Sequence, residues 1–230
     1  MIKLIRLEWR KWNIKKYIRY VLSMTVALLL FLAVTAGKAG ADTVSMGFHK
    51  RSVINAAVEL YSNMSYIVLA GVMLASFIVG EYEKGTIGLM FSYPIRRKKI
   101  VVAKIISVWC FCVMALILSK VFIYFSLLIM KSFINISISD IPIYSTMFWA
   151  DTLLSSIIMI SISFLALPVG LKTKSSKAAI VASVLIACFS HGNIMGYTFL
   201  GNIYYYGLLI FGAIVFTNSS IRKIDYTDVT

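Results

Sequence analysis

The residues best placed to do chemistry in this chain lie in one short polar segment between two long apolar runs. Residues 80–104 read GEYEKGTIGLMFSYPIRRKKIVVAK. Glu81 and Glu83 stand near the start of the segment, and four consecutive basic residues follow: Arg96, Arg97, Lys98 and Lys99. Opposite charges on one short segment suit electrostatic contact with a partner or a charged surface. The segment therefore indicates a contact element rather than a catalytic centre.

Familiar arrangements of catalytic or nucleotide-binding residues are missing from the sequence. The nearest match to the phosphate-binding pattern G-x-x-x-x-G-K-[ST] is GLKTKS at residues 170–175, and it lacks the second glycine. The zinc pattern H-E-x-x-H and the serine elbow G-x-S-x-G are also missing, and His49 and His191 lie far apart. We therefore expect no enzymatic activity, no catalytic residue, no metal site and no cofactor in this chain.

Composition places the chain in a membrane. Its 230 residues are 60% hydrophobic and 14% charged, and the mean hydropathy is +0.88. A soluble domain needs more polar residues to cover its surface. Apolar runs of about 20 residues, long enough to cross ~30 Å of hydrocarbon, recur along the chain. The net charge of +14 then reflects basic loops at the membrane rather than binding to nucleic acid.

We predict an all-α membrane protein with six transmembrane helices within residues 20–217. The helices are expected at about residues 20–36, 61–79, 105–130, 145–171, 178–190 and 197–217. Residues 1–19 combine seven Lys and Arg with two tryptophans, which is typical of an amphipathic interfacial helix; a solvated leader is the alternative. The first apolar run resembles a signal peptide, but its long basic leader and the five later runs favour a retained helix.

The distribution of Lys and Arg predicts the orientation. Eighteen of the 23 lie before the first run, in the segment after the second, in the loop after the fourth, or in the tail at residues 218–230. Only four lie in the opposite loops, residues 37–60 and 131–144. Basic loops stay in the cytoplasm. Both termini and the segment at residues 80–104 are therefore expected on the cytoplasmic side of the cell membrane.

Ionisable residues are rare within the predicted spans. Lys120 stands roughly 22 Å along the third helix, where its ammonium group is expected to reach the far interface. A role for Lys120 in a transport pathway is the alternative. Asp151 lies near the outer end of the fourth run. The chain thus shows no means of its own to use an ion gradient.

The fourth run carries a stripe of small polar residues and one methionine. Stripes of this kind most often let membrane helices pack closely. The alternative is that the stripe lines a substrate cavity. The residues concerned are Thr152, Ser155, Ser156, Met159 and Ser163. Pro168, near the inner end of the same run, is expected to kink or end the helix.

The order of residues in the segment at 80–104 resembles a known family. Glu81-Tyr-Glu-Lys-Gly-Thr86, then Leu89, Pro94, Arg96-Arg97 and Lys104, is similar to the loop after the second span of ABC-2-type transporter permeases. Either acid fits the place of the acid that precedes Gly-Thr in that family. An ordinary basic loop without a docked partner is the alternative, but it leaves the Glu-x-Gly-Thr pattern unexplained.

The resemblance implies a coupling helix that docks on a separate ATP-binding subunit. The expected contact residues are Glu81, Tyr82, Glu83, Gly85, Thr86, Ile87, Met90, Phe91 and Pro94. In this interpretation the apolar residues bury a face in the partner, the acids suit the start of the helix, and Pro94 ends it. The basic residues 96–99 would lie at the anionic inner leaflet.

The resemblance also implies a function. The chain is expected to be the permease subunit of an ATP-driven ABC exporter, with a second identical or paralogous permease chain and ATPase subunits that bind ATP and Mg²⁺. Compact members with short outer loops resemble permeases of antimicrobial-peptide export and immunity, which favours amphipathic peptides as substrates. Drugs, ions and glycans remain open. The alternative from another class is a membrane scaffold or sensor component that transports nothing.

Overall fold

The structure is a computed structural model that describes most of the chain. It covers residues 14–36, 43–46, 49–83, 97–133, 145–191, 193–194, 197–198 and 203–226. Most of the predicted interfacial helix (residues 1–13) and most of the predicted coupling helix (residues 84–96) therefore lie outside the described residues.

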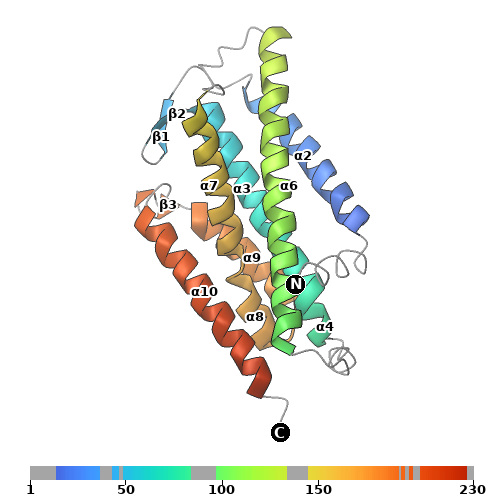
Figure 1. Cartoon of the computed structure of the whole chain (residues 1–230). Helices are drawn as coiled ribbons and strands as arrows, with labels where there is room; N and C mark the ends of the chain where they lie inside the picture. The colour runs from blue at the N-terminus through green and yellow to red at the C-terminus, as the bar shows by residue number, and fades with distance from the viewer. Residues whose placement is uncertain are drawn as a thin grey trace.

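Helices make up nearly all of the described chain (Figure 1). In order they are α2 (Ile14–Ala36), α3 (Val53–Leu74), the π-helix η1 (Ala75–Val79), α4 (Gly80–Glu83), α6 (Arg97–Phe133), α7 (Thr146–Ser163), α8 (Ala166–Thr173), α9 (Ser176–His191) and α10 (Ile203–Tyr226). α3, η1 and α4 follow one another without a break. The predicted helical class is confirmed apart from two short hairpins.

Both hairpins are antiparallel and two-stranded. β1 (Thr43–Met46) pairs with β2 (His49–Ser52), with Thr43 opposite Ser52. β3 (Asn193–Ile194) pairs with β4 (Tyr197–Thr198) just after α9. The β1–β2 hairpin lies toward the end of the bundle that holds the last turns of α6, which we call the upper end, whereas the β3–β4 hairpin lies lower, beside the start of α10 (Figure 1). The opposite, lower end holds α4, the first turn of α6 and the start of α9.

The chain is a multi-pass membrane protein. Among the described residues, four helical stretches are long and apolar enough to cross a bilayer: Lys16–Val34, Ile54–Glu83, Ile100–Met130 and Thr146–Thr173. α9 is a shorter apolar helix, and α10 follows it with 24 residues. Six spans and the direction of the chain across the membrane remain predictions.

α3 lies at the centre of the bundle and packs against α9, α6 and α7 (Figure 1). The contact with α9 is the closest, since a Cβ atom at Gly71 would lie 2.1 Å from the Cβ of Ser183. Gly170 of α8 allows a similar approach, because a Cβ there would lie 2.6 Å from that of Ala179. Small residues at crossings allow such contact between membrane helices, where close packing stabilises association.

The predicted break at Pro168 is confirmed. α7 ends at Ser163, a turn covers Phe164 and Leu165, and α8 begins at Ala166. Proline cannot donate a backbone hydrogen bond, and its ring clashes with the carbonyl four residues earlier, which here belongs to Phe164. The turn therefore lies where the proline disrupts the helix.

Candidate functional site

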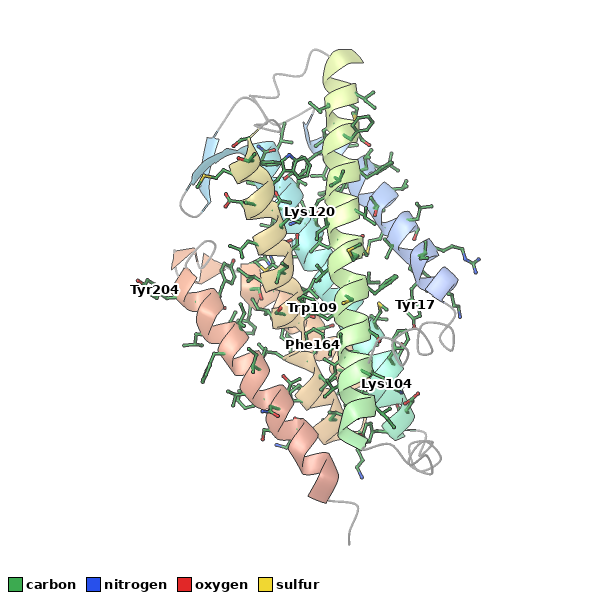
Figure 2. All side chains as sticks on the ribbon, in the orientation of Figure 1. Tyr17, Lys104, Trp109, Lys120, Phe164 and Tyr204 are labelled. Atoms are coloured by element: carbon green, nitrogen blue, oxygen red, sulfur yellow. The ribbon has the colours of Figure 1, made fainter. Side chains whose placement is uncertain are left out.

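The candidate coupling site begins at the lower end, where η1 leads into α4. Glu81 of α4 and Lys104 of α6 form an ion pair, and both side chains are buried. The ammonium group of Lys104 (labelled in Figure 2) also donates to the backbone carbonyl of Phe77 in η1, at 3.4 Å. π-Helical turns are rare and frequently occur at functional sites. The pair joins the two helices that bracket residues 84–96, so it holds the two ends of that connection together.

Glu83 links α4 to a third helix. Its Oε2 accepts a hydrogen bond from the backbone N–H of Ser176 at 3.1 Å and another from the Ser176 hydroxyl at 2.6 Å. Ser176 is the first residue of α9, where backbone N–H groups have no partner within the helix. Glu83 thus caps α9 from outside, although its own side chain is exposed. A carboxylate also interacts favourably with the N-terminal end of the helix dipole.

The residues predicted to contact the ATPase divide into those that the structure describes and those that lie outside the described residues. Tyr82 is half-buried and packs against the apolar core that α3, α6 and α7 share. Glu81, Tyr82 and Glu83 therefore lie in the last turn of α4, and each contacts other helices of this chain. The backbone of residues 97–99 forms the first turn of α6. The remaining predicted residues lie outside the described residues: Gly85, Thr86, Ile87, Met90, Phe91, Pro94 and Arg96.

A second buried ion pair lies nearer the upper end, between α3 and α6. The ammonium group of Lys120 lies 2.7 Å from Oε2 of Glu59, and the Lys120 side chain is fully buried (Figure 2). The Ser155 hydroxyl of α7 lies 3.1 Å from the same oxygen, and the Asn63 amide donates to it at 3.4 Å. The other carboxylate oxygen of Glu59 is buried and has no hydrogen-bond partner in the described part of the chain.

The position of Lys120 corrects a prediction. The sequence indicated that Lys120 reaches the far interface, whereas the structure buries it beside Glu59. The reason is that residues 53–60, expected in an outer loop, form the first turns of α3, which carry Glu59 into the bundle. Pairing then lowers the free-energy penalty of a buried charge. A signal for this existed, because Asn55, Glu59 and Asn63 recur at the helical spacing of four residues.

The upper end of α9 lies close to this second pair. His191, its last residue, is buried, and the charges of both Lys120 and Glu59 act on it. Its Nδ1 lies 3.2 Å from the carbonyl oxygen of Ala187. α9 therefore runs from the carboxylate of Glu83 at the lower end to the Glu59–Lys120 pair, and it packs along α3 between them.

The polar stripe of α7 lies within the bundle. Thr152, Ser156 and Ser163 are buried, and their hydroxyls donate to carbonyls of α7 at 2.9, 2.6 and 2.7 Å. Met159 packs in an apolar cluster with Ile67 of α3. Ser155 contacts the Glu59–Lys120 pair instead. These contacts are those of helix packing, and lining of a cavity shared with a second chain stays a prediction.

The described residues include no group of three or more His, Cys, Asp or Glu side chains that could hold a metal ion. Among the residues described, the charged groups brought together are two buried ion pairs and one carboxylate that caps a helix. Such contacts can transmit a displacement between helices.

Comparisons with known proteins found a family and one relative that this chain is similar to. The model for ABC-2 family transporter proteins matches residues 4–190. The uncharacterised protein YcbO of Bacillus subtilis (strain 168) is 29% identical to this chain over 122 residues, which are 53% of each protein. The chain thus matches about half the length of that curated relative. No solved structure matches the chain.

Proposed function

Because the chain belongs to the ABC-2 family of transporter proteins, we propose that it is the membrane permease of an ATP-driven ABC exporter. A separate ATPase subunit would bind ATP and Mg²⁺ and hydrolyse the nucleotide. This chain would supply the membrane path and have no enzymatic activity. A second permease chain, identical or paralogous, would complete the path through the membrane.

The proposal rests on the contacts at the two ends of residues 84–96, the proposed coupling segment. Glu81 and Lys104 join α4 to α6 through a buried ion pair, and Glu83 joins α4 to the start of α9. A partner that pushes or pulls residues 84–96 would therefore act on three helices together. Coupling between distant sites requires such a physically connected element.

The distribution of basic residues supports docking of the ATPase at the lower end of the bundle. The basic first turn of α6 and the exposed lysines Lys172, Lys174 and Lys177 lie at the lower end. Basic residues concentrate on the cytoplasmic side of membrane proteins. ATP is cytoplasmic, so the lower end would face the ATPase and both termini would lie in the cytoplasm, at the cell membrane.

For the substrate we favour amphipathic peptides, including antimicrobial peptides, on the strength of the compact layout with short outer loops. Drugs, ions and glycans are the alternatives within the same mechanism. A membrane scaffold or sensor that transports nothing is the alternative from another class, and it predicts that no ATPase associates with the chain.

Co-purification with an ATPase tests the proposal. The tagged chain is purified in mild detergent from its own cells, bound proteins are identified by mass spectrometry, and ATP hydrolysis is measured after reconstitution. We expect an ABC ATPase in stoichiometric amount and its loss in Gly85→Pro. Gly207→Ala is the matched control, because a Cβ at residue 207 meets nothing within 4 Å. Purification of intact chain without an ABC ATPase would favour the scaffold or sensor.

A further inference from the structure

An apolar crevice of about 390 Å³ lies between α6, α10 and the end of α7. Val102, Ile105 and Trp109 line it from α6, and Ile214 lines it from α10. Phe164, in the turn after α7, forms part of the third wall; Figure 2 labels it together with Trp109. A space of this volume falls within the range of small-molecule binding sites.

Three of the four polar side chains on the walls, those of Trp109, Ser161 and Thr217, are bonded within the protein, and the fourth is Asn218. Trp109 Nε1 donates to the Ser161 hydroxyl at 3.2 Å, and that hydroxyl donates to the carbonyl of Ile157 at 2.7 Å. The hydroxyl of Thr217 donates to the carbonyl of Ala213. Since these groups are satisfied, the walls favour an apolar occupant rather than one that needs hydrogen bonds.

The crevice lies in the half of the bundle near the lower end. Val102 and Trp109 stand roughly 8 and 18 Å along α6 from its first residue, Arg97, at ~1.5 Å per residue. The hydrocarbon core of a bilayer is ~30 Å thick. The crevice therefore extends ~10 Å along α6, which is less than the ~15 Å of one leaflet, so lipid acyl chains are long enough to fill it.

Basic residues stand at the lower end of both helices that flank the crevice. Lys98, Val102, Ile105 and Trp109 follow one another at spacings of four, three and four residues, which places them on one face of α6. On α10, Arg222 lies one helical turn beyond Asn218, which lines the crevice. The start of α6 and the end of α10 both lie at the lower end (Figure 1), so these basic positions of the two helices lie at the same end of the crevice.

We propose that this crevice binds one acyl chain of an anionic phospholipid, with the phosphate headgroup at the level of Lys98 and Arg222. The apolar crevice matches an acyl chain, and the basic positions at its lower end match the headgroup. Basic pockets between membrane helices on the cytoplasmic side recognise anionic headgroups in this way. The inference does not depend on transport, because it uses only the crevice and its charges.

Native mass spectrometry of the intact chain tests the proposal. The chain is reconstituted in an equal mixture of dioleoyl phosphatidylglycerol and dioleoyl phosphatidylcholine, then extracted, and the retained lipids are counted. We expect one phosphatidylglycerol per chain in preference to phosphatidylcholine. Lys98→Gln with Arg222→Gln should weaken its retention by roughly thirty-fold, since each basic residue near the surface contributes roughly five-fold. Lys172→Gln with Lys174→Gln, exposed at the same end, is the matched control.

A second pair of variants tests the acyl chain. Ile214→Trp fills the crevice and should abolish retention, whereas Val215→Trp adds the same ring at a neighbouring exposed position outside it. Equal retention of both lipids, or unchanged retention in both the charge variant and Ile214→Trp, would overturn the proposal. Displacement of the lipid by inorganic phosphate alone would also overturn it. So would a change in the number of chains per complex in Ile214→Trp, which would show that a second copy fills the crevice.

Discussion

The carboxylate of Glu83 holds Ser176 through two hydrogen bonds, at 3.1 Å to its backbone N–H and 2.6 Å to its hydroxyl. Glu83 ends α4, and Ser176 begins α9. The contact therefore joins the start of the proposed coupling segment to a helix that packs against α3. At the far end of that helix, His191 lies within reach of the charges of Glu59 and Lys120.

We expect Glu83→Ala to weaken coupling more than it weakens the fold. Loss of an exposed helix cap lowers the free energy of unfolding by about 1 kcal/mol, so the protein should still assemble. ATP hydrolysis by the reconstituted complex should continue while transport per ATP falls, because α9 no longer follows α4. Ser175→Ala, one residue earlier, is the control. Full transport per ATP in Glu83→Ala would show that this contact does not transmit the displacement.

The Glu81–Lys104 pair should behave as a unit in a double-mutant cycle. Lys104→Met leaves a carboxylate buried without its partner, which typically lowers the free energy of unfolding by about 3–5 kcal/mol. Glu81→Gln combined with Lys104→Met should recover much of that loss, because no charge remains buried. The measurement is the midpoint of thermal unfolding in detergent. Single-variant losses that simply add would show that the two side chains do not interact.

Variants of Lys120 test whether its ammonium group is buried in the bundle or exposed at the membrane–water interface. If the ammonium group is paired with Glu59, Lys120→Met should destabilise the protein strongly, again by about 3–5 kcal/mol. The additional change Glu59→Gln should restore much of the stability. Denaturant titrations of the three variants provide the comparison. A lysine that reaches the far interface would tolerate methionine with little change, so a neutral Lys120→Met would contradict the structure.

The crossing of α3 and α9 should be intolerant of added volume. Gly71→Ala places a Cβ only 2.1 Å from the Cβ of Ser183, so the helices must move apart. Overpacking of this kind costs about 1–3 kcal/mol. Ser183→Gly in the same chain should relieve the clash and raise the unfolding temperature again. The matched control is Gly207→Ala, where the space is open.

Local patterns in the sequence were sufficient to predict much of the fold. Long apolar runs predict helices that cross a membrane, because burial in lipid depends on consecutive residues within one segment. Pro168 predicts the break between α7 and α8, because its effect reaches only the preceding turn. The resemblance around Glu81-Tyr-Glu-Lys-Gly-Thr86 predicted the family, and the match over residues 4–190 confirms it.

Those local patterns did not predict which residues of different helices pair with each other. Glu59 and Lys120 are 61 residues apart, Glu83 and Ser176 are 93 apart, and Glu81 and Lys104 are 23 apart. Whether two such groups meet depends on the register and rotation of helices that pack against each other, which hydropathy does not contain. The sequence alone thus determined that this is a membrane protein of the ABC-2 family with a polar segment after its second apolar run. Only the tertiary structure decided which charges are buried together and which helices that segment holds, because those contacts form between helices and not along them.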